Sequence, residues 1–381
     1  MRRGSESATF GPAVLRREVL KANMSSFKKV RAARLSHAKW AFSTRLCTRR
    51  SDGYIRSDIA PVAGDLCLAR VVRLGNHQRL ELATGRRAHL YPGDEIVVAY
   101  GNRYATDQFD AVIPDSLKPC DLVAAGGVVG TVRSRHTRTR QPTRIEPVGL
   151  LCDAGGETWN LNRFRTPIPI PLQSQAFSPS VIAVTGAGMN SGKTTTASAM
   201  VHSLKKAGLS VAAIKLTGTG SGGDLWQFLD AGADHVYDFT NVGYVSTCGL
   251  RLPELTTIIQ DLIALVSTSH DVIIVEVADG LLQNETDLLL KSEVFRRSVD
   301  AMVFVAGDPM AAAFGVARLS EIGFTPSFVS GVVSASELSR VEAEQACCLP
   351  VLTLAEILGG NHVLPLVLQT LPEILAAEAA R

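Results

Sequence analysis

Residues 181–194 read VIAVTGAGMNSGKT, an apolar run that breaks into a glycine-rich loop and ends in Gly-Lys-Thr. A lysine and a threonine at the end of such a loop have the right chemistry to hold nucleotide phosphates: the lysine contacts the β- and γ-phosphates, and the threonine hydroxyl ligates Mg²⁺. The usual pattern is a glycine, then four residues of any type, then Gly-Lys-Thr, and here the position of the first glycine holds Ala187. A rigid pattern search would therefore miss the loop.

The order of apolar run, glycine loop, Lys-Thr and helix nevertheless predicts a phosphate-binding loop. Alanine fits the first position when its φ is negative, and we expect the neighbouring glycines, Gly186 and Gly188, to absorb the unusual torsions. The expected cofactors are ATP or GTP, with Mg²⁺. The expected nucleotide-binding residues are Gly186, Gly188, Met189, Asn190, Ser191, Gly192, Lys193, Thr194 and Thr195.

Two carboxylates follow apolar or glycine-rich runs and are candidate metal-binding residues. Glu276 ends the apolar run of DVIIVEVADG, where a carboxylate is tolerated only when it is paired or bound to a metal. Asp224 follows the loop TGTGSGG and could hold a water in the outer shell of Mg²⁺. We therefore expect a metal site made of Thr194, Asp224 and Glu276, while Asp279 is expected only to cap the segment that follows it.

A polar segment, DFTNVGYVSTCG, follows another apolar run and is suited to recognising a polar substrate. An Asx turn or a Ser/Thr turn would use the same residue types, and the two interpretations have equal weight. The substrate candidates are Thr217, Asp238, Thr240, Tyr244, Ser246 and Thr247.

Apolar strands alternate with amphipathic helices from about residue 180 onward, and this order positions the candidate residues. Such alternation implies a parallel sheet with helices on both faces. Ligands bind at the carboxyl ends of the strands in that fold, where the glycine-rich and acidic clusters of this half lie. The sequence predicts an α/β P-loop NTPase domain over residues 180–358 and a helical tail over 359–381.

The segment before it is different: residues 59–165 contain short β-branched runs separated by turn residues, and they predict a small β-rich domain, a barrel or a sandwich. Its stretch AYGNRYATDQFDAVIP carries polar and aromatic side chains that could line a pocket, although a solvated loop is the preferred interpretation. The arginine-rich stretch RSRHTRTRQPTR is interpreted as a solvated ribbon, with an anion or RNA contact second. A Pro-rich linker over 166–179 separates the domains.

The first 60 residues carry 14 Lys/Arg against 4 Asp/Glu, so this segment holds the net positive charge of a chain whose formal charge is only +3. We expect residues 1–58 to form a basic, poorly ordered leader, of which residues 1 to about 55 are dispensable. A mitochondrial transit peptide has a similar composition. Scattered cysteines and the lack of a long apolar stretch predict a cytoplasmic protein, or a mitochondrial one if the source is eukaryotic, without membrane or nucleic-acid binding.

Three families resemble the second half of the chain. The loop VTGAGMNSGKT resembles that of dethiobiotin synthetase, and DVIIVEVADG is similar to the metal-binding segment of that family, which implies that Glu276 is an acidic metal ligand. Lys215, in AAIKLTG, is similar to that family's substrate-side lysine. The chain departs from the family at Leu216 and over residues 277–280, which puts biotin-precursor chemistry in doubt.

The order of GKTT, a lysine-ending strand, Asp224 and DLWQFLDAGA also resembles the nucleotide-binding protein of molybdopterin guanine dinucleotide synthesis. The P-loop domain of a family that includes D-glutamate N-acetyltransferases is a third relative. The resemblances imply a shared P-loop superfamily and leave the exact family open.

The expected function is that of an ATP·Mg-dependent, ligase-like or kinase-like enzyme that activates or phosphorylates a small carboxylate-type metabolite, with Lys193, Lys215 and Glu276 as catalytic residues. We expect Lys215 to neutralise the substrate carboxylate, and we expect a homodimer. The alternative is a nucleotide-binding accessory or regulatory module that acts with a protein partner.

Overall fold

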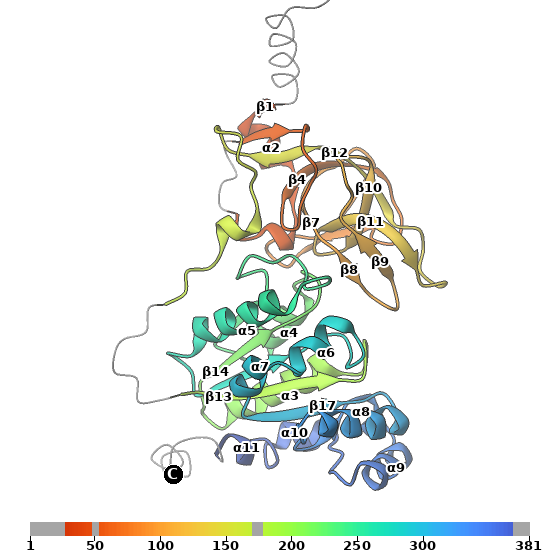
Figure 1. Ribbon diagram of the computed structural model, residues 1–381, viewed down its shortest axis with the longest axis vertical. Helices are drawn as coiled ribbons and strands as arrows, with labels where there is room; N and C mark the ends of the chain where they lie inside the picture. Colours follow the sequence, from red (N-terminus) through yellow and green to blue (C-terminus); the bar gives the residue numbers. More distant parts are fainter. Residues whose placement is uncertain (1–26, 48–52, 170–177, 369–381) are drawn as a thin grey trace, which may run out of the picture.

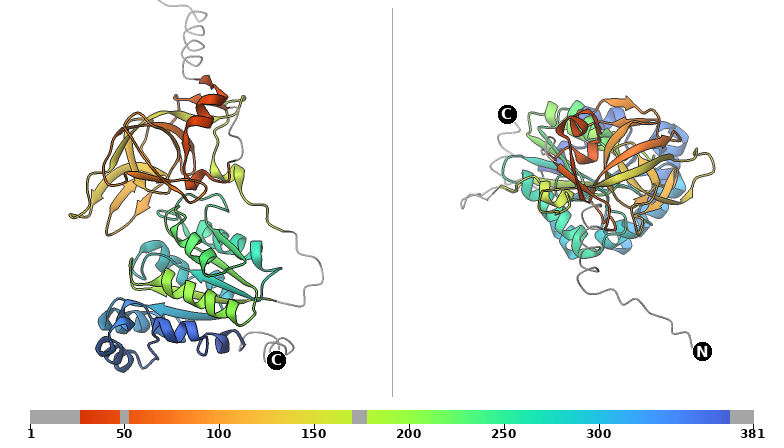
Figure 2. Two further views of the ribbon diagram at one scale, coloured as in Figure 1. Left: turned by 180° about the vertical axis from the view of Figure 1, so that it is seen from behind. Right: turned by 90° about the horizontal axis from the view of Figure 1, so that it is seen from above.

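The computed structural model of the protein describes residues 27–47, 53–169 and 178–368. Figure 1 shows a β-rich domain stacked on an α/β domain, and the views from behind and from above in Figure 2 agree with this arrangement. Both predicted fold types are therefore confirmed. No helix in these described ranges has the length and apolar character required to cross a membrane.

The β-rich domain contains the elements from β1 to η2. They are β1 (Phe27–Val30), α2 (Ala32–His37), β2 (Lys39–Trp40), η1 (Phe42–Thr44), β3 (Gly53–Arg56), β4 (Leu66–Arg73), β5 (Arg79–Glu81), β6 (Arg87–His89), β7 (Glu95–Tyr100), β8 (Arg103–Tyr104), β9 (Phe109–Val112), β10 (Cys120–Ala124), β11 (Val128–Arg135), β12 (Thr143–Cys152) and η2 (Leu161–Phe164).

Five of these strands close into a barrel, which decides between the two predicted architectures. The closed path runs β4–β7–β11–β10–β12 and back to β4, and its pairs are antiparallel except for β7 with β11. Side chains alternate across the wall with a period of two. Cys67, Ala69 and Val71 of β4 pack with Ile96 and Val98 of β7 in one buried cluster.

The intervening β4 residues Leu66 and Leu68 are also buried, because the N-terminal segment covers the outer face of the barrel. Leu35 and Trp40 pack there with Trp159. Residues 27–47 and 53–58 therefore belong to the β-rich domain, and the predicted leader of residues 1–58 was drawn too long. The prediction relied on the basic composition of this segment and overlooked its apolar residues, such as Phe42, which is fully buried. Residues 1–26 lie outside the described part of the chain.

The α/β domain contains the elements from β13 to α11. They are β13 (Ser180–Gly186), α3 (Lys193–Lys206), β14 (Val211–Lys215), α4 (Gly223–Asp230), β15 (His235–Asp238), α5 (Leu252–Val266), β16 (Val272–Glu276), α6 (Asn284–Leu290), α7 (Glu293–Ser298), β17 (Ala301–Val305), α8 (Pro309–Glu321), β18 (Val329–Ser330), η3 (Val332–Ala335), α9 (Glu337–Cys347), α10 (Leu354–Gly359) and α11 (Leu364–Leu368).

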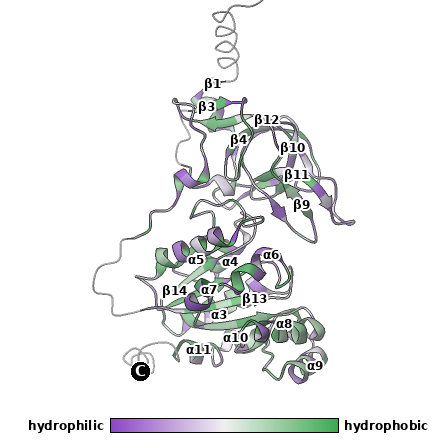
Figure 3. Ribbon diagram, viewed as in Figure 1, coloured by the Kyte–Doolittle hydropathy of each residue, from purple (hydrophilic) through white to green (hydrophobic). Residues whose placement is uncertain are grey.

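The sheet of this domain is parallel, as predicted, with the strand order β15–β14–β16–β13–β17–β18. Its central strands, such as β13 and β14, are coloured mainly as hydrophobic in Figure 3, because both faces of the sheet are covered by helices. Helices α3, α4, α10 and α11 pack on one face, and α5 to α9 contribute to the core on the other. Crossovers of this kind bring the carboxyl ends of β13, β14 and β16 to one edge.

Glu81 and Arg45 are two of the side chains that hold the β-rich domain on the α/β domain. Glu81, at the end of β5, accepts hydrogen bonds from Trp226 Nε1 (2.8 Å), the Gly222 backbone N–H (3.0 Å) and the Ser221 hydroxyl (3.1 Å). Arg45, just after η1, forms an ion pair at 3.1 Å with Asp238, which is fully buried. The first contact holds the glycine-rich loop after β14 against the barrel.

Candidate functional site

The loop between β13 and α3 has the geometry of a phosphate-binding loop, although its torsions differ from the prediction. Positive φ values occur at Asn190 (60°) and Gly192 (103°), and not at Gly186 or Gly188. Gly186 is needed for close approach instead, because a Cβ there would lie 2.9 Å from the Val305 carbonyl oxygen and from Lys193 side-chain carbons. A Cβ on Gly188 would meet nothing within 4 Å.

Lys193 begins α3 and its ammonium group folds back into the loop. Its Nζ donates a hydrogen bond to the Gly188 carbonyl oxygen at 2.6 Å, and the residue is only 6% exposed. Burial lowers the pKa of Lys193, and the carboxylates of Glu276 and Asp279 oppose that shift. The lysine therefore lies at the centre of the loop, where it can exchange a carbonyl for a phosphate oxygen.

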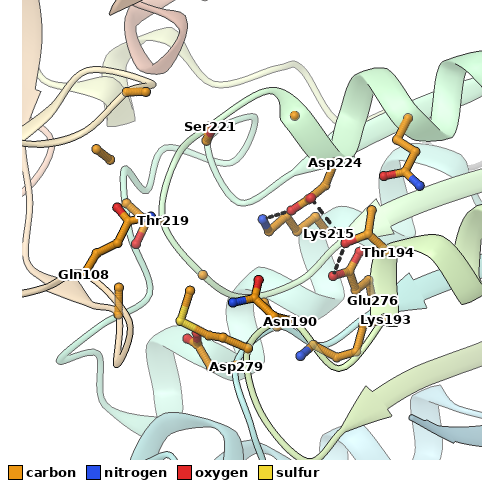
Figure 4. A pocket seen from close by; sticks show the side chains of 18 of the residues that line it. Gln108, Asn190, Lys193, Thr194, Lys215, Thr219, Ser221, Asp224, Glu276 and Asp279 are labelled. Carbon is orange, nitrogen blue, oxygen red and sulfur yellow. Dashed lines mark hydrogen bonds and ion pairs between the residues drawn. The ribbon is translucent and has the colours of Figure 1, made fainter. Parts of the chain in front are cut away.

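Four side chains from β14, β16, α3 and α4 meet beside this lysine. The Thr194 hydroxyl lies 3.0 Å from Glu276 Oε1 and 3.2 Å from Asp224 Oδ1, so it can donate to either carboxylate. The Lys215 ammonium forms an ion pair with the other oxygen of Asp224. Figure 4 shows the four residues side by side at one end of the pocket. The structure thus brings together the predicted metal site and the predicted substrate-side lysine.

The two carboxylates of this cluster have opposite electrostatic environments. Burial and the neighbouring charge of Asp224 raise the pKa of Glu276 to about 7. Burial also acts to raise the pKa of Asp224, but the Lys215 ammonium outweighs it and the pKa falls. Burial disfavours the charged form of Lys215, but Asp224 and Glu276 together raise its pKa. The lysine and Asp224 are thus a charged pair, and Glu276 is left without a cation of its own.

The residues present fit a Mg²⁺ ion bound with a nucleotide. Glu276 Oε2 is buried and has no hydrogen-bond partner, and its neighbour Oε1 faces the Thr194 hydroxyl. Within the described residues no group of three or more His, Cys, Asp or Glu side chains is arranged as a metal site. A metal here would therefore take its ligands from Thr194, Glu276, water and phosphate oxygens, as Mg²⁺ usually does.

A cavity of about 770 Å³ opens in front of this cluster, and both domains line it. Figure 4 shows Gln108 on the side of the pocket opposite to Lys193, Thr194 and Glu276. The β-rich domain contributes His77, Arg87, Arg103, Tyr104, Ala105, Gln108, Ala124 and Ala125 to the lining. For the stretch AYGNRYATDQFDAVIP, a solvated loop was the preferred interpretation and a pocket lining was the second. The structure shows that part of this stretch lines a pocket.

Several predicted substrate residues do not line this cavity. Asp238 and Thr240 are anchored to Arg45, with Thr240 Oγ1 2.5 Å from Arg45 Nη1. Thr217 donates to the Ala278 carbonyl oxygen, and Thr247 Oγ1 accepts from the Gly218 N–H. Ser246 Oγ accepts a backbone N–H, and Tyr244 packs against a hydrophobic core. These polar side chains stabilise turns and the domain contact, and their role as substrate contacts stays a prediction.

Asp279 was expected only as a cap, but it lines the cavity with φ at 65°. Burial raises its pKa, against the opposing effects of Lys193 and Lys215. The barrel residues His77 and Arg87 carried no motif that could have assigned them to the site, whereas Gln108 belongs to the stretch for which a pocket lining was the second interpretation. Only the packing of one domain on the other places them there.

Residues 181–314 match the sequence model of the family described as molybdopterin guanine dinucleotide synthesis protein B, MobB. The matched range includes the phosphate-binding loop, Lys215, Asp224 and Glu276. Residues 181–314 form a MobB-like P-loop NTPase domain. The rest of the chain, including the barrel, lies outside the match, so the MobB-like domain is a nucleotide-binding module within a larger protein.

No curated protein sequence matches the chain. Among solved structures, a DUF1611 family protein from Anabaena variabilis is 15% identical with a TM-score of 0.37, over 57% of this chain and 66% of that one. The signal recognition particle 54 kDa protein from Aeropyrum pernix, in complex with GDP, is 18% identical with a TM-score of 0.34, over 53% and 50%. The chain thus spans between half and about two thirds of the length of these two proteins.

The hydrogenase maturation factor HypB from Archaeoglobus fulgidus is 12% identical to this chain with a TM-score of 0.33, over 53% of this chain and 90% of HypB.

Proposed function

We propose that the protein is a nucleotide- and Mg²⁺-dependent enzyme that activates or phosphorylates a small carboxylate-type metabolite in the cavity between its two domains. The observation that carries this proposal is the composition of the cavity wall. One side presents Lys193, Thr194 and Glu276, and the other side presents the polar barrel residues Arg103 and Gln108. Such a two-sided site suits a small second substrate better than a large one.

The chain's own residues would divide the work between binding and charge stabilisation. Lys193 and the loop N–H groups neutralise phosphate oxygens, while Thr194 and Glu276 offer ligands to the metal. Mg²⁺, when bound, would stabilise the negative charge that develops on the transferred phosphoryl group. Asp224 and Lys215 lie beside this point as an ion pair, so Lys215 positions Asp224 in addition to facing the cavity.

Because Lys215 forms an ion pair with Asp224, a substitution of Lys215 affects the structure as well as any contact with substrate. Replacing Lys215 with an apolar residue would leave the partly buried Asp224 without its cation, next to Glu276, and would destabilise the fold. Loss of activity in such a variant would not separate a substrate contact from a structural one. Lys193 and Thr194 are the better probes of the reaction.

The test is phosphate release by the full chain with ATP or GTP and Mg²⁺, with and without a panel of dicarboxylates, amino acids and biotin precursors. One compound should stimulate release, and Lys193→Ala and Thr194→Ala should abolish the stimulated rate. Lys206→Ala is the matched control, because Lys206 lies on the same helix and is exposed. Unchanged release in the Lys193 and Thr194 variants would refute the assignment of the loop.

A second candidate function is supported by the family match. Because MobB is described as a protein of molybdopterin guanine dinucleotide synthesis, the chain could act as a nucleotide-binding accessory module with a protein partner. Phosphate release that occurs only when a protein partner is added, and with no small molecule of the panel, would favour this function over the first.

A further inference from the structure

The hairpin formed by β8 and β9 brings the barrel into contact with the phosphate-binding loop. Arg103 of β8 pairs with Ala111 of β9, and Tyr104 pairs with Asp110. In the turn between the strands, Asp107 accepts a hydrogen bond at 3.1 Å from the side-chain amide of Asn190, which belongs to the loop. The hairpin is therefore docked directly on the nucleotide-binding element.

Arg103 is a buried cation on this hairpin, and it lines the cavity with only 8% of its surface exposed. None of the carboxylates in the described residues forms an ion pair with it. One Nη donates to Gln108 Oε1 at 3.0 Å, and Nε is buried without a hydrogen-bond partner. A buried charge with an unused donor is costly unless a ligand completes its environment.

The electrostatics of the barrel wall single out this arginine. Burial lowers the pKa of Arg103 to about 10, with Asp107 and Asp279 opposing the shift, so the guanidinium stays charged at neutral pH. Burial and the charge of Arg103 lower the pKa of His77 to about 4, so that ring is neutral. Arg87, the other arginine of the cavity wall, is exposed to solvent.

We propose that Arg103 binds an anionic group, a carboxylate or a phosphate, of the second substrate, and that Gln108 holds the guanidinium in place. This inference rests on the proposed function, because it names the class of the molecule that occupies the barrel side of the cavity. The opposite wall already provides Lys193 and the loop amides for nucleotide phosphates. A guanidinium offers a planar pair of donors that matches the geometry of either anion.

The experiment is calorimetric titration of the full chain after saturation with a non-hydrolysable ATP analogue and Mg²⁺, so that the phosphate-binding loop is filled. Succinate and inorganic phosphate are the two probes, and they distinguish a carboxylate site from a phosphate site. Arg103→Gln should weaken binding of the preferred probe by about tenfold to a hundredfold, because a charge-assisted, paired contact is lost. Arg103→Lys keeps the charge without the fork and should weaken binding less.

Arg138→Gln is the matched control, since Arg138 is an exposed arginine of the same domain. The expected result is unaltered nucleotide affinity in all variants and loss of anion binding only at Arg103. If neither anion binds to the wild-type chain, or if both Arg103 variants bind the probe as the wild type does, the inference is overturned. Thermal unfolding of each variant identifies a folding defect. If Arg103→Gln is defective in folding, anion binding by Arg103→Lys decides whether the inference holds.

If the nucleotide analogue itself does not bind, the proposed function fails independently of Arg103. The two anions are then titrated into Lys193→Ala, which removes the competing cation of the loop. If the double variant Lys193→Ala, Arg103→Gln then fails to bind the anion, the anion site is supported independently of the proposed function. If the double variant binds the anion as Lys193→Ala does, the anion site is overturned.

Discussion

Replacement of Glu276 by Gln tests the electrostatics of the site in the absence of any ligand. The pKa of Glu276 is raised from 4.5 to about 7, so the folded chain holds this proton more tightly than the unfolded chain does. Its contribution to stability is therefore complete below pH 4.5 and is lost as the pH rises toward 7. At pH 8 the ionised carboxylate costs about 3 kcal/mol, and at pH 5.5 about 1 kcal/mol.

Glutamine has nearly the same shape and no charge, so Glu276→Gln should remove this cost. We expect the ligand-free variant to be more stable than the wild type at pH 8, by about 2 kcal/mol more than at pH 5.5. For a domain of this size that difference is roughly 4–8 °C in Tm, well within the precision of thermal unfolding. Asp224→Asn should have the opposite sign, because Asp224 pairs with the buried Lys215.

The reasoning would be refuted if ligand-free Glu276→Gln were less stable than the wild type at pH 8. That result would mean that Glu276 is ionised and paired with Lys215 in a purely structural role. With nucleotide and Mg²⁺ present, the same variant should lose turnover by about 10² or more while its nucleotide affinity changes much less. The gain of stability in the empty site and the loss of turnover in the loaded site would together identify Glu276 as a metal ligand.

Three further predictions concern contacts around the site. Glu81→Ala should lower the free energy of unfolding by about 2–4 kcal/mol in chemical denaturation, because the Gly222 and Trp226 N–H groups lose their acceptor; no change would mean that water replaces the carboxylate. Arg45→Ala should lower the free energy of unfolding by about 3–5 kcal/mol, because it leaves the buried carboxylate of Asp238 unpaired, and adding Asp238→Asn should restore most of this loss. Gly280→Ala should weaken nucleotide binding by about tenfold, since its Cβ would lie 2.3 Å from a carbonyl oxygen of the phosphate-binding loop, whereas Gly188→Ala has open space and should bind normally in the same titration.

Local sequence patterns were sufficient to predict the nucleotide-binding half of the site. A buried parallel strand, a glycine loop and a helix beginning with Lys193-Thr194 are specified by neighbouring residues, and apolar strands that end in Glu276 or Lys215 bring both side chains to one edge. The torsions were wrong in detail, because Asn190 and Gly192 take the positive φ values. The deviation at Ala187 left the overall pattern intact.

The leader and the polar run after β15 show what local patterns leave undecided. Basic composition predicted disorder up to residue 58, yet Trp40 and Phe42 are buried and Arg45 reaches the α/β domain. The polar run after β15 was interpreted as a substrate site or as a turn with equal weight, and in the structure Asp238 holds that arginine. A polar side chain near a strand end can bind a ligand or form a hydrogen bond with another part of the chain. The neighbouring residues in the sequence do not distinguish these two cases.

By itself the sequence determined the parallel P-loop domain and the position of its phosphate-binding loop, because both depend on contacts between residues close together in the chain. Only the tertiary structure decided that the β-rich segment closes as a barrel and that Arg103 and Gln108 face the loop from the other side of the cavity. Closure depends on the register between strands far apart in sequence, and the cavity wall depends on one domain docking on another. Barrel closure and domain docking are not encoded in any short stretch of sequence, because both depend on how much surface the whole folded chain buries.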